Sequence, residues 1–164
     1  VGAVPRLIDL GVKPQVLGPA LSLVIAQRLV RELCPACRKP RILDRMELAA
    51  VAAFVGTLPD RVVKAPYANP TVFEPVGCAA CGGIGYRGRI SIFELFVVNE
   101  SIEQAIYRNP TELELKALAK QQGMTTMQED GAMKVLQGVT SFSEIERLTG
   151  PIPWLPESIR PKQI

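Results

Sequence analysis

The chain has 164 residues, enough for one domain or two small subdomains, and its formal net charge is +3. Apolar residues make up 48% and aromatic residues only 5%, which is typical of a globular fold and argues against a surface of base-stacking rings. There is no histidine, which excludes histidine-dependent nucleophiles and the histidine-ligated zinc proteases. No stretch approaches the roughly 20 apolar residues that span a bilayer, so we expect no transmembrane segment.

The opening of the sequence predicts a piece of a longer chain. Val1 is not an initiator methionine, and no signal-peptide pattern follows it. Prolines and glycines interrupt residues 1–19. The spacing of apolar residues from Ala20 to Leu33 then predicts an amphipathic helix, which Pro35 ends.

The middle of the chain predicts one short helix and two strands. The helix is expected from Arg45 to Val55, closed by Gly56, and a proline-rich loop then leads to a short strand over 71–74. Five glycines between residues 77 and 88 predict tight turns. The β-branched and aromatic run over 89–98 predicts a buried strand.

The last third carries clear helix-start signals. Asn99 is suited to cap a helix from Glu100 to Tyr107. Three later helices each begin with a capping box: Thr111 with Glu114, Thr126 with Glu129, and Ser141 with Glu144. Glycines follow these helices at 123, 138 and 150, so we expect a compact helical subdomain over 99–150. Four prolines in 151–164 predict an extended or disordered tail.

All four cysteines fall into two identical Cys-x-x-Cys pairs separated by 40 residues. Each pair turns two thiolates toward one point, and two pairs complete a tetrahedral site. We therefore predict a structural zinc ion with the ligands Cys34, Cys37, Cys78 and Cys81. The separation exceeds the roughly 15–20 residues of a zinc ribbon, so the metal would staple an inserted subdomain. Two disulfides, or a redox pair, are the weaker alternatives, since nothing signals secretion and neither pair opens a helix after a strand.

Basic residues cluster around the first cysteine pair: Arg28, Arg31, Arg38, Lys39, Arg41 and Arg45. We expect a solvated face that offsets the charge of the metal–thiolate complex, with contact to an acidic partner subunit, lipid headgroup or phosphate as the alternative. No Gly-Lys dipeptide occurs, so there is no P-loop, and no carboxylate pair suggests acid–base chemistry. We predict no catalytic and no nucleotide-binding residue in this chain.

Ordered motifs carry a resemblance to a known family. Cys34-Pro-x-Cys37, then Gly77-Cys78-x-x-Cys81 and Gly85-Tyr86-x-Gly88-Arg89-x-x-Ile92-x-Glu94, resemble the tetracysteine signature of the secretion ATPase superfamily. Its members are the type II secretion ATPases and the type IV pilus assembly ATPases. The stretches 26–31 and 138–149 fit the same family, so the resemblance covers about residues 1–149. Departures are small: Ser91, Phe93 and Leu10 stand where the family tends to have Gly, Tyr and Met.

The resemblance implies an α/β fold, the C-terminal part of a RecA-like ATPase domain. Residues 1–33 and the strand 89–98 would belong to the core, 34–88 to a zinc-binding subdomain, and 99–150 to the helical subdomain. It also implies a parent that is a cytoplasmic homo-hexamer, held at the inner membrane by a platform protein, which hydrolyses ATP with Mg²⁺ to power secretion or pilus assembly. The family's nucleotide-binding motifs would lie upstream of Val1, so we expect the chain alone to be inactive.

Two other classes of protein remain as hypotheses. One is a stand-alone zinc module that binds nucleic acid, and low aromatic content and acidic C-terminal helices count against it. The other is a co-chaperone-like zinc module, since Cys78-x-x-Cys81-x-Gly83-x-Gly85 matches the unit repeated there. A single copy of that unit counts against this second hypothesis.

Overall fold

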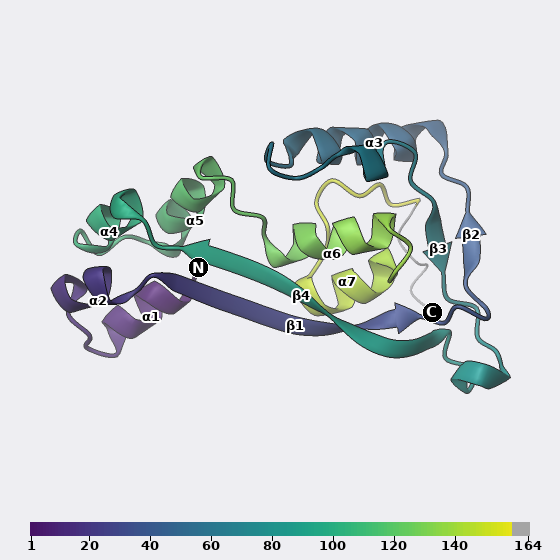
Figure 1. The fold of residues 1–164 in the computed structure, drawn as a ribbon, viewed down its shortest axis with the longest axis horizontal. Coiled ribbons are helices and arrows are strands. Elements are labelled where there is room, and N and C mark those ends of the chain that lie inside the picture. Colours follow the sequence, from purple (N-terminus) through teal and green to yellow (C-terminus); the bar gives the residue numbers. More distant parts are fainter. Residues whose placement is uncertain (159–164) are drawn as a thin grey trace. The chain divides into compact units, whose positions relative to one another are not determined.

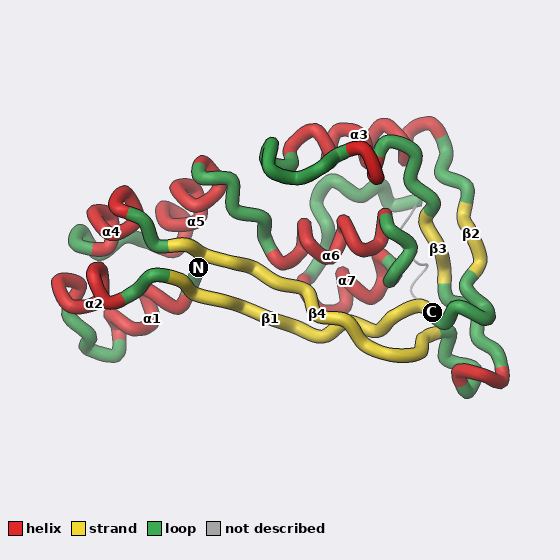
Figure 2. Tube along the Cα trace, in the orientation of Figure 1, coloured by secondary structure: helices red, strands yellow, loops and turns green. Residues whose placement is uncertain are grey.

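The computed structural model describes residues 1–158, in which helices and strands are mixed along the chain (Figures 1 and 2). The helices are α1 (Ala3–Asp9), α2 (Pro14–Ala20), α3 (Arg45–Thr57), α4 (Glu100–Ile106), α5 (Glu112–Gln121), α6 (Met127–Leu136) and α7 (Phe142–Thr149). The strands are β1 (Leu23–Leu33), β2 (Lys39–Arg41), β3 (Val72–Glu74) and β4 (Tyr86–Val97). Two 3₁₀ turns are η1 (Ala65–Tyr67) and η2 (Ala79–Cys81). The predicted α/β class is confirmed.

The strands form two two-stranded sheets. β2 pairs with β3 in antiparallel register, with Lys39 opposite Glu74 and Arg41 opposite Val72. β1 pairs with β4, and the two run in opposite directions (Figure 1). Backbone hydrogen bonds from Val98 N to Ser22 O and from Cys34 N to Gly85 O, both 2.9 Å, lie at the two ends of this pairing.

The helix predicted over 20–33 is wrong, because this segment is the strand β1. Apolar residues at three- and four-residue spacing indicated a helix, but Val24, Ile25 and Val30 are β-branched and suit a strand equally well. Pairing with the long strand β4 then decides the conformation, and that partner lies about sixty residues further along the chain. The short helices α1 and α2 that precede β1 were not expected.

The strand predicted over 89–98 is present as β4, which begins three residues earlier. It is not buried throughout. Ile92 and Phe96 are fully buried, whereas Phe93, Leu95 and Val97 are exposed. One face of β4 therefore packs into the cores and the other does not, as expected for a strand in which successive side chains alternate.

Contacts divide the chain into two compact units. The first consists of residues 1–26 and 94–125, and α1, α2, α4 and α5 bury Val4, Phe96, Ile102 and Leu115 among their core residues. The second consists of residues 27–93 and the chain from 126 onward, with a core that includes Val51, Phe54, Ile92, Val135 and Ile145. β1 and β4 pass through both units.

The helices predicted over 99–150 are all present, but they do not group as one compact subdomain. α4 and α5 belong to the first unit, whereas α6 and α7 belong to the second. The predicted caps are observed: Asn99 Oδ1 accepts from Ile102 N at 3.1 Å, and Thr111 and Thr126 form reciprocal capping boxes. An unexpected box at Asp44 and Glu47 begins α3, which extends past Gly56 to Thr57.

Residues 151–158 contain turns and no helix or strand, and they are part of the second unit. Ile152 and Leu155 are buried in that unit's core. The predicted tail residues 159–164 lie outside the described part of the chain.

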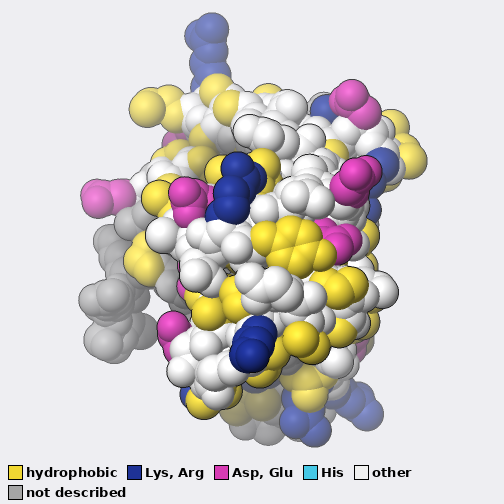
Figure 3. All heavy atoms as spheres, turned by 90° about the vertical axis from the view of Figure 1, so that its left-hand side faces the viewer, with side chains coloured by type: hydrophobic (Ala, Val, Ile, Leu, Met, Phe, Trp, Pro, Cys, Tyr) yellow, Lys and Arg dark blue, Asp and Glu magenta, His cyan; other side chains and the backbone are white. Residues whose placement is uncertain are grey.

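The described surface and helices give two further observations. Figure 3 looks onto the side where Figure 1 draws α1, α2 and α4, and it shows apolar side chains scattered among charges of both signs. Among residues 1–158, no helix is both long enough and apolar enough to cross a bilayer.

Candidate metal centre

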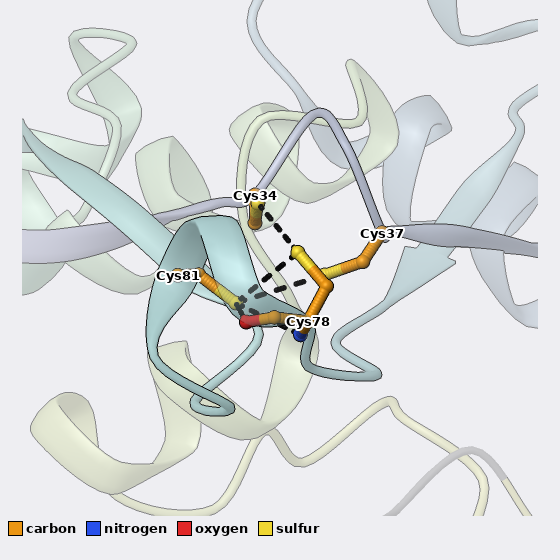
Figure 4. Close-up of side chains that lie close together, drawn as sticks. All are labelled: Cys34, Cys37, Cys78 and Cys81. Atoms are coloured by element: carbon orange, nitrogen blue, oxygen red, sulfur yellow. Dashed lines mark hydrogen bonds between the residues drawn. The ribbon is translucent and has the colours of Figure 1, made fainter.

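The topology of the two sheets brings the cysteine pairs together. Cys34 and Cys37 lie in the connection from β1 to β2, and Cys78 and Cys81 lie in the connection from β3 to β4. Because β1 pairs with β4 and β2 with β3, both connections are held at the same place between the sheets. Figure 4 shows the four side chains converging from these two loops.

The four sulfur atoms are arranged as the ligands of one metal ion. They all lie within 4.8 Å of one another. The Sγ–Sγ distance is 4.0 Å between Cys34 and Cys78, and 3.8 Å both between Cys37 and Cys81 and between Cys78 and Cys81. Sulfurs bound tetrahedrally to zinc at about 2.3 Å lie about 3.8 Å apart, whereas a disulfide bond is about 2.05 Å long. All four cysteines are free thiols, so the donor set fits a tetrahedral, thiolate-binding ion.

Backbone hydrogen bonds shape both turns. In the first turn, Cys37 N and Arg38 N donate to Cys34 O at 3.2 and 2.9 Å. In the second, Cys78 N and Gly85 N donate to Cys81 Sγ at 3.2 and 3.3 Å. The two amides of the second turn are directed at the Cys81 sulfur, where they stabilise a thiolate.

Glycine is required in the second turn. Gly77 has φ +101°, and a Cβ there would lie 2.3 Å from Gly83 O. Gly85 has φ +77°, and a Cβ would lie 2.5 Å from Pro75 Cβ. A side chain at either position meets both backbone strain and a close contact, which accounts for the predicted glycine-rich turn.

The thiols differ in their acidity. The backbone N–H of Cys78, helped by that of Gly85, lowers the pKa of the Cys81 thiol to about 6. Burial raises the pKa of the Cys37 thiol to about 11. A cation within the cluster would supply the positive charge that the Cys37 thiolate needs.

Of the six basic residues near the first pair, four are exposed, namely Arg28, Arg38, Lys39 and Arg45, and their role in offsetting the charge of a metal–thiolate complex stays a prediction. Four of the six guanidinium or ammonium side chains make internal contacts. Arg28 Nη1 donates to Leu148 O, Arg38 Nη1 donates to Gly138 O, Arg31 binds Glu144, and Arg41 binds Glu47. Arg31 also lies over the Tyr86 ring at 4.2 Å, and Arg38 over the Phe73 ring at 4.6 Å. These contacts join the residues near the first cysteine pair to α3, α7, β3 and the turn that follows α6.

Glu144 has a role that its sequence position did not indicate. Ser141 caps α7, but the Glu144 carboxylate does not return the bond. It is fully buried and accepts from Arg31 N at 3.1 Å, Arg31 Nε at 2.9 Å and Arg147 Nη2 at 2.8 Å. No local signal distinguishes this glutamate from Glu114 or Glu129, because its partner Arg31 lies 113 positions away.

Comparison with known proteins gives consistent matches. Residues 1–147 match the family model described as Type II/IV secretion system protein. The chain is 39% identical to Type II secretion system protein E of Aeromonas hydrophila over 149 residues, which are 91% of this chain and 27% of the relative. It is 35% identical to the Type IV pilus assembly ATPase PilB of Myxococcus xanthus over 151 residues, 92% of this chain and 25% of the relative. The chain therefore spans about a quarter of the length of these relatives.

Proposed function

Because the chain belongs to the type II/IV secretion system protein family, we propose that it is the C-terminal region of an ATPase motor for type II secretion or type IV pilus assembly. The family match over residues 1–147 is the observation that carries this proposal, and it confirms the resemblance seen in the motifs. It also favours a motor protein over a stand-alone zinc module of the nucleic-acid-binding or co-chaperone type.

In this proposal the chain supplies structure and contacts, and the rest of the motor supplies the ATP and Mg²⁺ site. Residues 1–33 and 89–98 belong to a RecA-like core, and 34–88 form the zinc-binding subdomain. The assembled motor is a homo-hexamer in the cytoplasm, held at the inner membrane by a platform protein. The names of the relatives, Type II secretion system protein E and Type IV pilus assembly ATPase PilB, support the assignment to a secretion or pilus motor.

We further propose that the ion held by Cys34, Cys37, Cys78 and Cys81 is zinc. The sulfur distances and the absence of histidine support this choice. Four thiolates fill the coordination of zinc, so the ion would close the chain between the pairs into a loop and would not bind substrate. The second turn's backbone amides would hold Cys81 as a thiolate ready for the metal.

The test is made in cells that carry the gene for the whole protein. We expect Cys78→Ser with Cys81→Ser to abolish secretion into the medium or the assembly of surface pili, whichever system the protein serves. Ala79→Ser is the matched control, because Ala79 is exposed within the same turn. Elemental analysis of the purified chain should give close to one zinc per molecule, and none in the double variant.

Two outcomes would contradict the proposal, and they are distinguishable. Normal secretion and normal pili in the double variant would remove the role in secretion. Absence of zinc from the wild-type protein, with a mass indicating two disulfides, would remove the metal assignment and leave the family unaffected.

A further inference from the structure

The segment 151–158 lies beyond the match to the family model, which ends at residue 147, and yet it is built into the second unit. Ile152 is fully buried and Leu155 is 3% exposed. The Trp154 ring stacks on the Phe54 ring of α3, with a centroid distance of 4.4 Å and an interplanar angle of 10°. Its edge contacts the Phe142 ring of α7 at 5.9 Å. Trp154 therefore contacts both α3, which lies between the two cysteine pairs in the sequence, and α7.

Hydrogen bonds fix both ends of this segment. At its beginning, Gln128 Nε2 of α6 donates to Gly150 O at 3.0 Å and to Pro151 O at 3.2 Å, and Ile152 N donates to Glu146 Oε1 at 2.9 Å. At its end, Ser158 Oγ donates to Glu47 Oε1 at 2.8 Å, and Arg41 Nη2 donates to Ser158 O at 3.1 Å. The first anchors belong to α6 and α7, and the second belong to α3 and β2.

We propose that residues 151–158 are a strap that holds α3 against α6 and α7 independently of the cysteine cluster. The cysteine cluster holds the two ends of the chain between the pairs, residues 38–77. The helix α3 lies within this stretch, away from the cysteines in the sequence. Figure 1 draws the yellow segment that follows α7 running between α3 and the helices α6 and α7. Prolines at 151, 153 and 156 restrict the unfolded segment, which lowers the entropy lost when the strap is ordered.

The strap makes a specific prediction about local opening. Stacking of the half-buried Trp154 ring on the buried Phe54 ring adds to the area that they bury, so loss of Trp154 should free α3 locally. The cysteine cluster should stay closed, because none of its hydrogen bonds involves the strap. The position of α3 is thus controlled by a segment of the chain that can be changed without altering a metal ligand.

Hydrogen exchange on the full zinc-loaded chain tests the strap, with zinc measured in the same samples. We expect Trp154→Ala to raise amide exchange in 45–57 about tenfold and to leave 112–121 and the zinc content unchanged. Glu157→Gln is the matched control, since Glu157 is exposed in the same segment. Trp154→Phe should restore most of the protection, because it keeps a ring over Phe54.

A second variant keeps the test valid if Trp154→Ala does not fold. Ser158→Ala retains Trp154, the only tryptophan of the chain, whose fluorescence reports whether the strap is seated. We expect its emission to shift to the red together with a smaller rise of exchange in α3. Unchanged exchange in α3, or an equal rise across α3, α6 and α7, would overturn the strap and make the segment an ordinary part of the core.

Discussion

Glu144 shows how one buried carboxylate can join segments that are distant in the sequence. Its side chain has no exposed surface, and it receives hydrogen bonds from two guanidinium groups and one backbone amide. Burial alone would raise the pKa of Glu144, but the bonds from Arg147 and Arg31 lower it to about 2. The folded protein therefore holds Glu144 ionised far below the ordinary pKa of 4.5.

The depressed pKa predicts how stability depends on pH. Because the folded pKa lies below the unfolded one, the contribution of Glu144 is complete above about pH 4.5 and is lost as the pH falls toward 2. We expect Glu144→Gln to lower the free energy of unfolding by about 2 kcal/mol at pH 7, since it leaves Arg31 and Arg147 without their charged partner. Urea unfolding followed by circular dichroism measures this difference.

The variant and the wild type should converge as the pH falls below about 2, where the Glu144 carboxyl becomes neutral like the amide of the Glu144→Gln variant. Glu100→Gln is the control, because Glu100 is an exposed residue of α4, and we expect it to change stability by less than about 0.5 kcal/mol. A difference between Glu144→Gln and the wild type that stays constant from pH 7 to pH 2 would show that ionisation of Glu144 contributes nothing.

The cysteines and Glu144 also mark what the sequence can and cannot predict about the site. The spacing of the two pairs was sufficient to identify all four candidate ligands, because a Cys-x-x-Cys turn sets its own local geometry. The partners of Glu144 and Trp154 could not be predicted, since Arg31 and Phe54 lie about a hundred residues before them. Such contacts depend on the tertiary fold and leave no local pattern.

At the scale of elements, helices with local capping signals were predicted correctly, whereas a strand that depends on a distant partner was not. The helices α4 to α7 were predicted correctly, because an N-cap side chain and a closing glycine act within a few residues. β1 was predicted as a helix, because its conformation depends on the distant strand β4. Helices that depend on their own capping residues were therefore predictable, and β1, which depends on pairing with β4, was not.

Two glycines with opposite surroundings test the role of the turn at the metal site. Gly77→Ala places a Cβ 2.3 Å from Gly83 O at φ +101°, so we expect it to lower zinc affinity at least tenfold. Gly56 lies in the helix α3 with nothing within 4 Å of a Cβ, so Gly56→Ala should instead stabilise the protein by about 0.5–1 kcal/mol. Competition with a chelator and thermal unfolding measure the two effects.

The comparison between these variants separates the turn from general stability. If Gly77→Ala retained full zinc affinity, the left-handed turn would not be needed to present Cys78 and Cys81. A loss of zinc affinity in Gly56→Ala would show that affinity follows any change in the second unit.

At the scale of the whole molecule, the contacts place two neighbouring helices in different units. α5 ends at Gln121 in the first unit, and α6 begins at Met127 in the second. The core around α6 includes Val51, Phe54 and Val72 from the chain between the cysteine pairs, whereas the core around α5 includes none of them. The expectation of one helical subdomain over 99–150 missed this division, because capping signals identify helices and not the groups in which they pack.

Removal of the metal should therefore affect α6 and spare α5. Structural zinc contributes roughly 10–16 kcal/mol of apparent binding free energy, comparable to the whole stability of a domain. Hydrogen exchange before and after chelation should show the largest loss of protection in 34–44 and 72–90, next to the cysteines, a smaller loss in 127–136, and none in 112–121, while the strap keeps 45–57 protected. Re-addition of zinc is the control for irreversible damage and should restore the original pattern. Equal loss in 112–121 and 127–136 would mean that the two units unfold as one, because α5 could then respond only through cooperative unfolding with the metal-bound unit.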